Sequence, residues 1–278
     1  MKNLLEKFSI KDKTCIITGG AGLLGLQHAK AVLEGEGVPV LLDISEEALQ
    51  RAKNLLSEEY PNNEISIYKV DITNESELEK TRENLLKEYG HIDILINNAA
   101  NNPKMEKKSS NLGNIRFDNF PIEIWLEDVA VGLTGAFLCS KIFGKSMEDN
   151  GQGVILNISS DLGVIAPDQR IYREEGKAAE DQTVKPVTYS VIKHGLVGLT
   201  KYLATYWADK NIRVNTLCPA GVENGQDEGF IKRLTNLVPM GRMANVDEYQ
   251  STVLFMISDA SSYMTGAMVI VDGGRTCW

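Results

Sequence analysis

The sequence predicts an α/β fold in which one parallel sheet is covered by helices on both faces. Short runs rich in leucine and β-branched residues alternate with longer amphipathic runs along the whole chain. The short runs are almost continuously apolar, which is typical of parallel strands buried on both sides. No internal repeat or linker interrupts the pattern, and 278 residues are near the upper size of one hydrophobic core. We therefore expect a single domain over residues 1–278.

The short and long runs define the expected elements. The expected strands are Thr14–Thr18, Val38–Asp43, Ile65–Val70, Ile92–Asn97, Val154–Ile158, Ile212–Leu217 and Met268–Val271. The expected helices lie near Gly22–Glu36, Glu46–Tyr60, Glu75–Tyr89, Ile122–Asp149, Thr188–Asp209 and Val246–Ser258. A polar segment over 101–121 and a charged segment over 165–186 interrupt the alternation as inserted loops. Both follow predicted strands, where an open α/β sheet binds its ligands, and loops of this length are usually functional or disordered.

Composition and charge narrow the classes of partner. The net charge of −9 and the pI near 5.0 argue against nucleic acid or an anionic membrane. The four cysteines are far apart, show no metal-ligand spacing and predict reduced thiols. The first residues hold too short an apolar run for a signal peptide, and no stretch is long enough to span a bilayer. We expect a cytoplasmic protein that acts on a small molecule and holds no metal.

A glycine-rich turn follows the first predicted strand. Gly19-Gly20-Ala21-Gly22-Leu23-Leu24-Gly25 comes directly after Thr18 and leads into a predicted helix. Glycines permit the tight turn and let backbone amides approach a pyrophosphate, whose charge the helix N-terminus favours. A turn without a ligand is the alternative, but the second strand ends in Asp43, close to the spacing of a dinucleotide-binding fingerprint. The pattern thus predicts a Rossmann-type, doubly wound sheet of about seven strands.

Asp43 also indicates which dinucleotide is bound. A carboxylate at this position can accept hydrogen bonds from the ribose hydroxyls of the adenosine, and it would repel a 2′-phosphate. No Arg or Lys stands within residues 19–25 or directly after Asp43. We therefore expect NAD, with NADP disfavoured.

Tyr189 and Lys193 are spaced by four residues in a predicted helix. This spacing puts both on one face, where the ammonium can favour the phenolate and prepare the tyrosine for proton transfer. Tyr206 and Lys210 have the same spacing but fall at the predicted helix end, so we interpret them as structural. Tyr172 lies in the charged segment, with glycine four residues later. Tyr189 is therefore the catalytic candidate.

Together these features resemble the short-chain dehydrogenase/reductase family over nearly the whole chain. Besides the glycine turn and the Tyr–Lys pair, the resemblance is carried in order by Asp71-Ile72, Asn97-Asn98-Ala99-Ala100, Asn157-Ile158-Ser159-Ser160, Arg213-Val214-Asn215, Pro219-Ala220-Gly221-Val222, Tyr263-Met264-Thr265-Gly266 and Val271-Asp272-Gly273-Gly274. The asparagine-rich fourth-strand end and the final fragment are similar to the short single-domain branch. The Gly-x-x-Gly-x-x-Gly spacing is similar to the extended branch, for whose additional substrate lobe the chain has no room.

The resemblance implies roles for particular residues. Tyr189 would be the general acid/base, Lys193 would lower its pKa and hold the nicotinamide ribose, and Ser160 would hydrogen-bond the substrate oxygen. The cofactor-binding residues would be Gly19, Gly22, Leu24, Gly25, Asp43, Asp71, Ile72, Asn98, Ala99, Ala100, Tyr189, Lys193, Pro219, Gly221 and Val222. Alternatively, Asp71 helps to start a helix and Ser160 is a turn residue. The resemblance also implies a homotetramer, or at least a dimer, formed partly through the helix over 188–209.

Two departures from the family pattern bear on function. Gly132 stands where the family has an asparagine that is thought to hold a proton-relay water by distorting its helix. Glycine can free the backbone but offers no amide, so the relay must differ. Ser160 and Tyr189 are 29 residues apart, farther than in the family, because of the charged segment 165–186. We interpret this segment as a substrate-specific lid; a surface excursion without substrate contact is the alternative.

The sequence therefore predicts an NAD-dependent oxidoreductase that interconverts a secondary alcohol and a ketone. The polar side chains of the inserted loops indicate a polar substrate, with a sugar or sugar derivative as a candidate. Two other functions stay open. One is a dinucleotide-binding regulatory protein with altered catalysis, which Gly132 would explain. The other is an epimerase or dehydratase that recycles its NAD.

Overall fold

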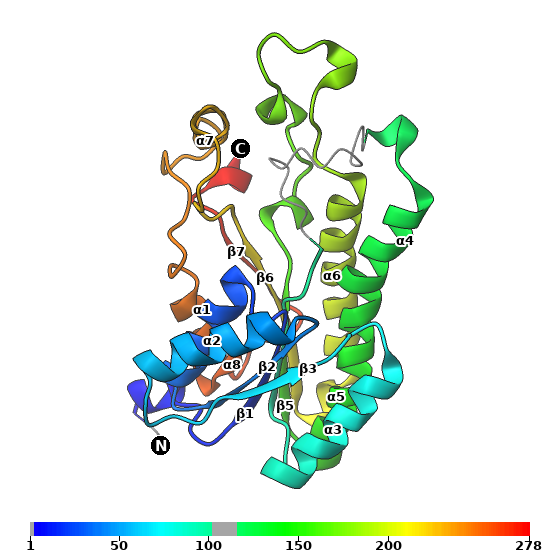
Figure 1. Cartoon of the computed structure of the whole chain (residues 1–278). Coiled ribbons are helices and arrows are strands. Elements are labelled where there is room, and N and C mark those ends of the chain that lie inside the picture. The colour runs from blue at the N-terminus through cyan, green and yellow to red at the C-terminus, as the bar shows by residue number, and fades with distance from the viewer. Residues whose placement is uncertain (1–2, 102–115) are drawn as a thin grey trace.

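The computed structural model describes residues 3–101 and 116–278, and its framework is a seven-stranded sheet. All strands run parallel, in the order β3-β2-β1-β4-β5-β6-β7 (Figure 1). The strands are β1 (Thr14–Thr18), β2 (Val38–Asp43), β3 (Ser66–Lys69), β4 (Ile94–Asn97), β5 (Gly153–Ile158), β6 (Ile212–Pro219) and β7 (Met268–Val271). The predicted parallel sheet of about seven strands is confirmed.

The strand order reverses at β1, which pairs with β2 on one side and with β4 on the other. Because every strand is parallel, all carboxyl ends lie at one edge of the sheet. Asp43, Asn97 and Ile158 are therefore brought to the same edge, although they are far apart in the sequence. The reversal point at the carboxyl ends is where open α/β sheets bind their ligands.

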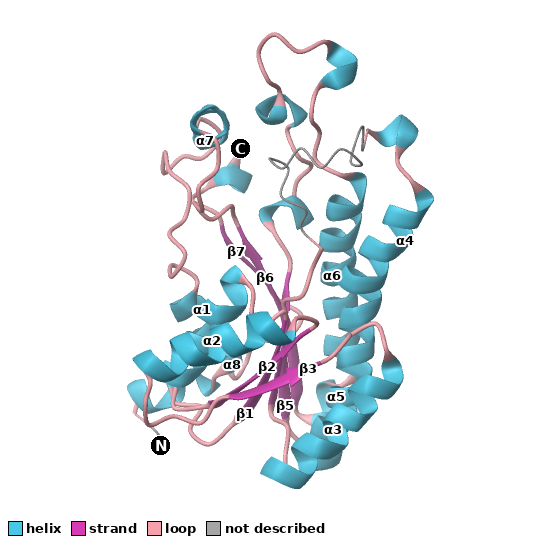
Figure 2. Cartoon of the chain, viewed as in Figure 1, coloured by secondary structure: helices cyan, strands magenta, loops and turns pink. Residues whose placement is uncertain are grey.

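Helices cover both faces of the sheet, as predicted (Figure 2). The helices α1 (Leu23–Glu34), α2 (Glu46–Glu59) and α8 (Gln250–Ile257) bury one face, and α3 (Glu75–Tyr89), α5 (Gly135–Asn150) and α6 (Val187–Tyr206) bury the other. Neighbouring strand residues such as Ile16 and Ile17 point into opposite cores, and both are fully buried. This two-sided burial explains why the strands are apolar throughout.

Some boundaries differ from the sequence-based expectation. The helix predicted over 122–149 is one continuous helical run, in which a π-helical turn (Ala130–Thr134) separates α4 (Ile122–Val129) from α5. The helix α7 (Glu228–Thr235) was not predicted, because it is short and lies in a long connection after β6. Asp227 begins α7 by accepting a hydrogen bond from the Phe230 amide at 3.0 Å.

The charged segment 165–186 is an excursion with short 3₁₀ turns that packs against α7. Ile171 is buried in a small cluster with Leu234 and Met243. The rings of Tyr172 and Phe230 lie 5.5 Å apart, and Arg233 Nε donates to the Ile171 carbonyl at 2.8 Å. The segment therefore has a fixed base on the fold. The other expected loop, 101–121, lies for the most part outside the described residues.

Across the part of the chain that the structure describes, no helix has both the length and the apolar character needed to cross a membrane.

Candidate active site

The glycine turn after β1 has a geometry that only glycine allows. Gly19 has a φ of +61°, and a Cβ there would lie 2.9 Å from the Cα of Ala99. A Cβ on Gly25 would lie 2.2 Å from the Gly19 carbonyl oxygen. Gly22 then stands at the N-terminal end of α1. The turn therefore brings bare backbone to the helix N-terminus, and these residues fit the pyrophosphate of a dinucleotide.

Asp43 lies beside this turn. One carboxylate oxygen accepts a hydrogen bond from the Ala21 amide at 3.3 Å, and the other accepts from the Ser45 amide at 3.1 Å. The carboxylate is half-buried at the carboxyl end of β2. The spacing predicted from sequence is thus realised as direct contact between the acidic residue and the glycine turn. The adenosine ribose of a dinucleotide bound at the turn would lie near the Asp43 carboxylate.

Asn98 and Ala99 join the ends of β1 and β4. The Asn98 side chain donates to the carbonyls of Thr18 and Gly19 at 3.0 and 3.2 Å. The amides of Asn98 and Ala99 both donate to the Thr18 hydroxyl, at 3.0 and 3.1 Å. Ala100 follows them and lines a small pocket beside Tyr189. These predicted cofactor residues therefore lie where expected, at the reversal point of the sheet.

Asp71 and Ile72 follow β3 but point to different surroundings. The Asp71 carboxylate accepts from the Thr73 amide at 2.9 Å and from its hydroxyl at 2.7 Å, which forms a turn before α3. Asn74, not Asp71, caps that helix. Ile72 is buried, and its side chain fills the space that a Cβ on Gly135 would occupy. That Asp71 and Ile72 flank the adenine stays a prediction.

Ser160, Tyr189 and Lys193 come together at the carboxyl end of β5. Lys193 lies one helical turn after Tyr189 on α6, with its Nζ 5.7 Å from the centre of the Tyr189 ring. Its ammonium donates to the Ile158 carbonyl at 2.8 Å. The Ser159 hydroxyl donates to the Lys193 carbonyl at 2.7 Å, so α6 is tied to the strand end that carries Ser160. The three residues that the sequence motifs pointed to therefore lie close together.

Burial dominates the electrostatics of these residues. It raises the pKa of Tyr189 above its ordinary value; a hydrogen bond with the Ser160 side chain lowers the pKa, and the charge of Asp161 raises it further. Burial also lowers the pKa of Lys193 to about 8, and the nearby charge of Lys185 acts in the same direction. The expected lowering of the Tyr189 pKa by Lys193 stays a prediction.

Gly132 lies in the π-helical turn between α4 and α5. A Cβ at this position would lie 2.7 Å from Cγ2 of Ile192, which is on α6 between Tyr189 and Lys193. Gly132 therefore lets the distorted helix approach α6 closely. The family's asparagine is associated with a distorted helix. The helix is also distorted here, although Gly132 offers no side-chain amide.

The residues after β6 form the remaining wall. Pro219 ends β6, Val222 is buried and pairs with Ala244, and a Cβ on Gly221 would lie 3.1 Å from Cε of Met243. Tyr249, at the start of α8, donates its hydroxyl to the Ala220 carbonyl at 3.0 Å. This connection fixes the segment that would contact the nicotinamide end of the cofactor.

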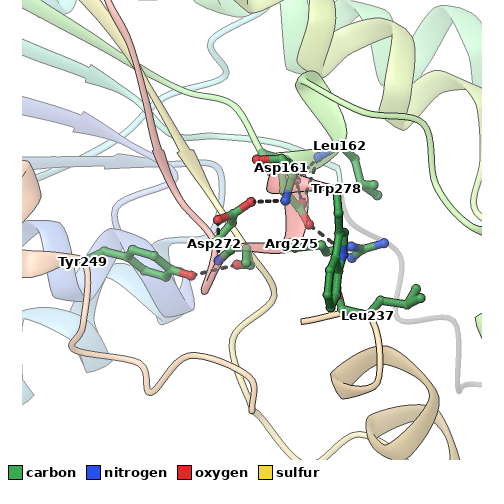
Figure 3. Close-up of polar contacts among 11 residues, drawn as sticks. Asp161, Leu162, Leu237, Tyr249, Asp272, Arg275 and Trp278 are labelled. Atoms are coloured by element: carbon green, nitrogen blue, oxygen red, sulfur yellow. Dashed lines mark hydrogen bonds and ion pairs between the residues drawn. The ribbon is translucent and has the colours of Figure 1, made fainter. Parts of the chain in front are cut away.

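The C-terminal segment contributes a contact that the sequence did not suggest (Figure 3). Arg275 forms a buried ion pair with Asp161, with 3.1 Å between Nη1 and Oδ2. The other oxygen of Asp161 accepts from the Ser160 hydroxyl at 2.7 Å and from the Leu162 amide at 2.8 Å. Asp272 in turn holds the segment by accepting from the amides of Gly274 and Thr276 at 2.9 and 2.7 Å. Asp161, which follows the candidate catalytic Ser160, is thus held in place by the C-terminal segment.

A buried polar network below the site was also missed. Asn97 donates to Ser140 and Asn157 at 3.0 and 2.8 Å, and Asn157 donates to Thr200 at 2.8 Å. Thr216 donates to the same Thr200 hydroxyl at 2.6 Å. The network joins β4, β5 and β6 to α5 and α6. Asparagine at the ends of two apolar strands was the available signal, because a buried amide needs partners.

The two tyrosines that were not chosen as the catalytic residue, Tyr206 and Tyr172, lie in the segments described above, the end of α6 and the charged segment. Tyr206 ends α6, is 60% exposed and stacks on Tyr202 with 5.9 Å between the rings. Lys210 pairs with Asp209 at 3.5 Å beyond the helix. Tyr172 packs against Phe230 in the charged segment, and burial raises its pKa well above the ordinary value.

Comparison with known proteins agrees with this geometry. A family model described as enoyl-(acyl carrier protein) reductase matches residues 21–276. The chain belongs to the short-chain dehydrogenase/reductase family. Members of this family with similar sequences include an NAD-dependent glycerol dehydrogenase of Listeria innocua, which is 32% identical over 280 residues and covers 99% of this chain and 98% of that protein. An NADP-dependent mannitol dehydrogenase of Hypocrea jecorina is 28% identical, with 98% and 96% covered.

A solved structure of the same family is also similar. The crystal structure of NAD⁺-bound xylitol dehydrogenase has a TM-score of 0.80 and 26% identity, and the match covers 95% of this chain and 99% of that one. As a short-chain dehydrogenase/reductase, the protein is an oxidoreductase that uses a dinucleotide cofactor and acts on alcohol or carbonyl groups.

Proposed function

We propose that the protein is an NAD-dependent dehydrogenase that interconverts a secondary alcohol and a ketone on a polar small molecule of the sugar or polyol class. The observation that carries the proposal is the convergence of Ser160, Tyr189 and Lys193 at the carboxyl end of β5. The names of the similar proteins, which act on glycerol, mannitol and xylitol, support a polyol substrate.

Each residue has a role that its surroundings support. Tyr189 accepts the hydroxyl proton when the alcohol is oxidised and returns it when the ketone is reduced. Ser160 hydrogen-bonds the substrate oxygen and stabilises the charge that develops there. Lys193 holds the nicotinamide ribose and favours the tyrosine phenolate. When bound, the nicotinamide accepts or supplies the hydride. Asp43 hydrogen-bonds the adenosine ribose and repels a 2′-phosphate, which favours NAD over NADP.

The test is the absorbance of NADH during incubation of the protein with NAD and a panel of polyols and keto-sugars. We expect turnover that is faster with NAD than with NADP. Tyr189→Phe should lower kcat by about 10²- to 10⁴-fold, the usual contribution of a general acid/base. The matched control is Tyr206→Phe, which removes the hydroxyl of the other tyrosine followed by lysine at four residues.

The same assay separates the alternatives. NADH binding without turnover, unaffected by Tyr189→Phe, would favour a regulatory protein, for which Gly132 is the motivation. A tightly retained cofactor with substrate conversion but no net change in absorbance would favour an epimerase or dehydratase.

We also propose that copies of the chain associate through α6. Val191 and Tyr202 are exposed on this helix, at 41% and 63%, and a Cβ on Gly198 would meet nothing within 4 Å. Gly195 does not contribute to this face, because it packs against Leu133 of the same chain. Light scattering should show a dimer or tetramer, and Tyr202→Glu should shift the protein toward the monomer; a wild-type monomer would contradict the proposal.

A further inference from the structure

In the described part of the chain, the basic side chains near the candidate catalytic residues include Arg275, Lys193 and Lys185, and the first two have partners. Arg275 is paired with the Asp161 carboxylate, and the Lys193 ammonium donates to the Ile158 carbonyl. The third is Lys185, at the end of the charged segment. Its ammonium makes no hydrogen bond or ion pair with any side chain or carbonyl of residues 3–101 and 116–278. It lies instead over the Tyr189 ring, 3.8 Å from the ring centre.

The position of Lys185 is fixed by the fold. Its amide donates to the Gln169 side chain at 2.8 Å, and its carbonyl accepts from the same side chain at 3.5 Å. Pro186 follows and leads directly into α6. The two ends of the charged segment are therefore joined at Lys185, four residues before Tyr189 and outside α6. These contacts fix the Lys185 backbone at the start of α6, where its ammonium lies over the Tyr189 ring.

Lys185 stands between two hollows. It lines the small pocket beside Tyr189, together with Ala100 and Gly132. It also lines a larger cavity of about 370 Å³, together with Arg116 and Asp118. Lys185 and Pro186 line both hollows, and Tyr189 lines the smaller one.

The charge of Lys185 is only partly solvated where it lies. The side chain is half-buried, and burial lowers its pKa to about 8, opposed by the charge of Asp161. Asp161 itself is already engaged by Arg275 and Ser160. An ammonium in such a place gains from an anion that arrives with the substrate, because a charge-assisted hydrogen bond is strong where water is excluded.

We propose that Lys185 binds an anionic group of the substrate, so that the natural substrate is a sugar or polyol derivative bearing a carboxylate or a phosphate. This assignment rests on the proposed dehydrogenase function. It also gives the charged segment its part in substrate selection, since Lys185 is the residue through which that segment reaches the reacting hydroxyl.

The experiment compares neutral and anionic forms of one carbon skeleton. The substrates are glucitol, gluconate and glucitol 6-phosphate, and the matching mannitol series. For each substrate, kcat/KM with NAD is measured for wild type, Lys185→Met, Lys185→Arg and the control Lys210→Met. Wild type should prefer an anionic form, and the preferred anion distinguishes carboxylate from phosphate. Lys185→Met should lower the ratio of kcat/KM for that anionic form to kcat/KM for the neutral polyol by about 10- to 100-fold, mainly through KM for the anionic form. Lys185→Arg should retain most of the preference.

The failures of the two proposals can be told apart. If neutral polyols are turned over as well as their anionic forms, or if Lys185→Met lowers both equally, the anion assignment is wrong while the dehydrogenase function stands. If nothing is turned over, the anion assignment is tested by binding instead. NADH-loaded protein is titrated with gluconate and with glucitol 6-phosphate in a calorimeter. Binding that Lys185→Met weakens by 10-fold or more supports the site; no binding, or equal binding by both proteins, overturns it.

Discussion

The cofactor end and the substrate end of the candidate site are built in different ways. At the cofactor end, the turn over 19–25 meets Asp43 and Asn98, and each contact involves backbone of the turn itself or of the strand before it. At the substrate end, Ser160 depends on Asp161, which depends on Arg275, 114 residues away in sequence. Lys185 reaches Tyr189 through a segment that is anchored on α7. Both regions use contacts between distant segments, since Asn98 meets Thr18 across 80 residues of sequence. The residues of the first region stand in motifs that are recognisable in the sequence, whereas the long-range contacts of the second do not.

The largest expected effect tests the long-range end. Arg275→Met leaves the Asp161 carboxylate buried without its partner, so we expect the free energy of unfolding to fall by about 3–5 kcal/mol. Urea unfolding measures this loss. The double variant Asp161→Leu with Arg275→Met should be clearly more stable than Arg275→Met alone, because neither charge is then left buried. Equal stability of the single variant and wild type would show that the ion pair does not hold this end together.

A smaller loss is expected at the cofactor end. Gly25→Ala places a Cβ 2.2 Å from the Gly19 carbonyl, a backbone atom that cannot rotate away. We expect destabilisation of about 1–3 kcal/mol from overpacking, together with weakened NADH binding, measured by fluorescence titration. Gly151→Ala is the control: its φ of +71° adds backbone strain that Gly25 does not have, but a Cβ there meets nothing within 4 Å. The control should bind NADH as wild type does.

Gly132→Asn restores the family's residue and tests how the two helices fit. The new side chain would collide with Cγ2 of Ile192, so we expect a loss of about 1–3 kcal/mol in stability and lower activity. The double variant Gly132→Asn with Ile192→Ala removes the colliding atom and should recover part of both. If Gly132→Asn alone is as stable as wild type, close packing of Ile192 is not the reason for glycine here.

The smallest effects are opposite shifts in pH dependence. Alcohol oxidation needs the Tyr189 phenolate, so kcat/KM should rise with pH toward the Tyr189 pKa. Ser160 lowers that pKa and Asp161 raises it. The alkaline rise should therefore move to higher pH in Ser160→Ala and to lower pH in Asp161→Asn. Shifts in the same direction would mean that Tyr189 is not the titrating base.

Much of the fold could be predicted because its signals are local. Strands buried on two faces must be apolar throughout, and the Gly19–Gly25 turn can be recognised by residue type alone. The same holds for Tyr189 and Lys193, since a spacing of four residues on a helix determines that they share a face. Only weak signals existed for α7, which is short, and for Asn97 and Asn157, which bond to each other and to residues of α5 and α6.

By itself, the sequence determined the parallel sheet, the glycine turn with its acidic partner, and the tyrosine and lysine on one helix face, because periodicity and short spacings encode each of them. Tertiary structure alone decided that Arg275 would neutralise Asp161 and that Gly132 would admit Ile192. It also decided that the Lys185 ammonium would lie over Tyr189 without a hydrogen bond or ion pair to any residue that the structure describes. The physical reason is that burial sets the strength of a charge and the room for a side chain, and burial depends on segments that meet only when the chain is folded.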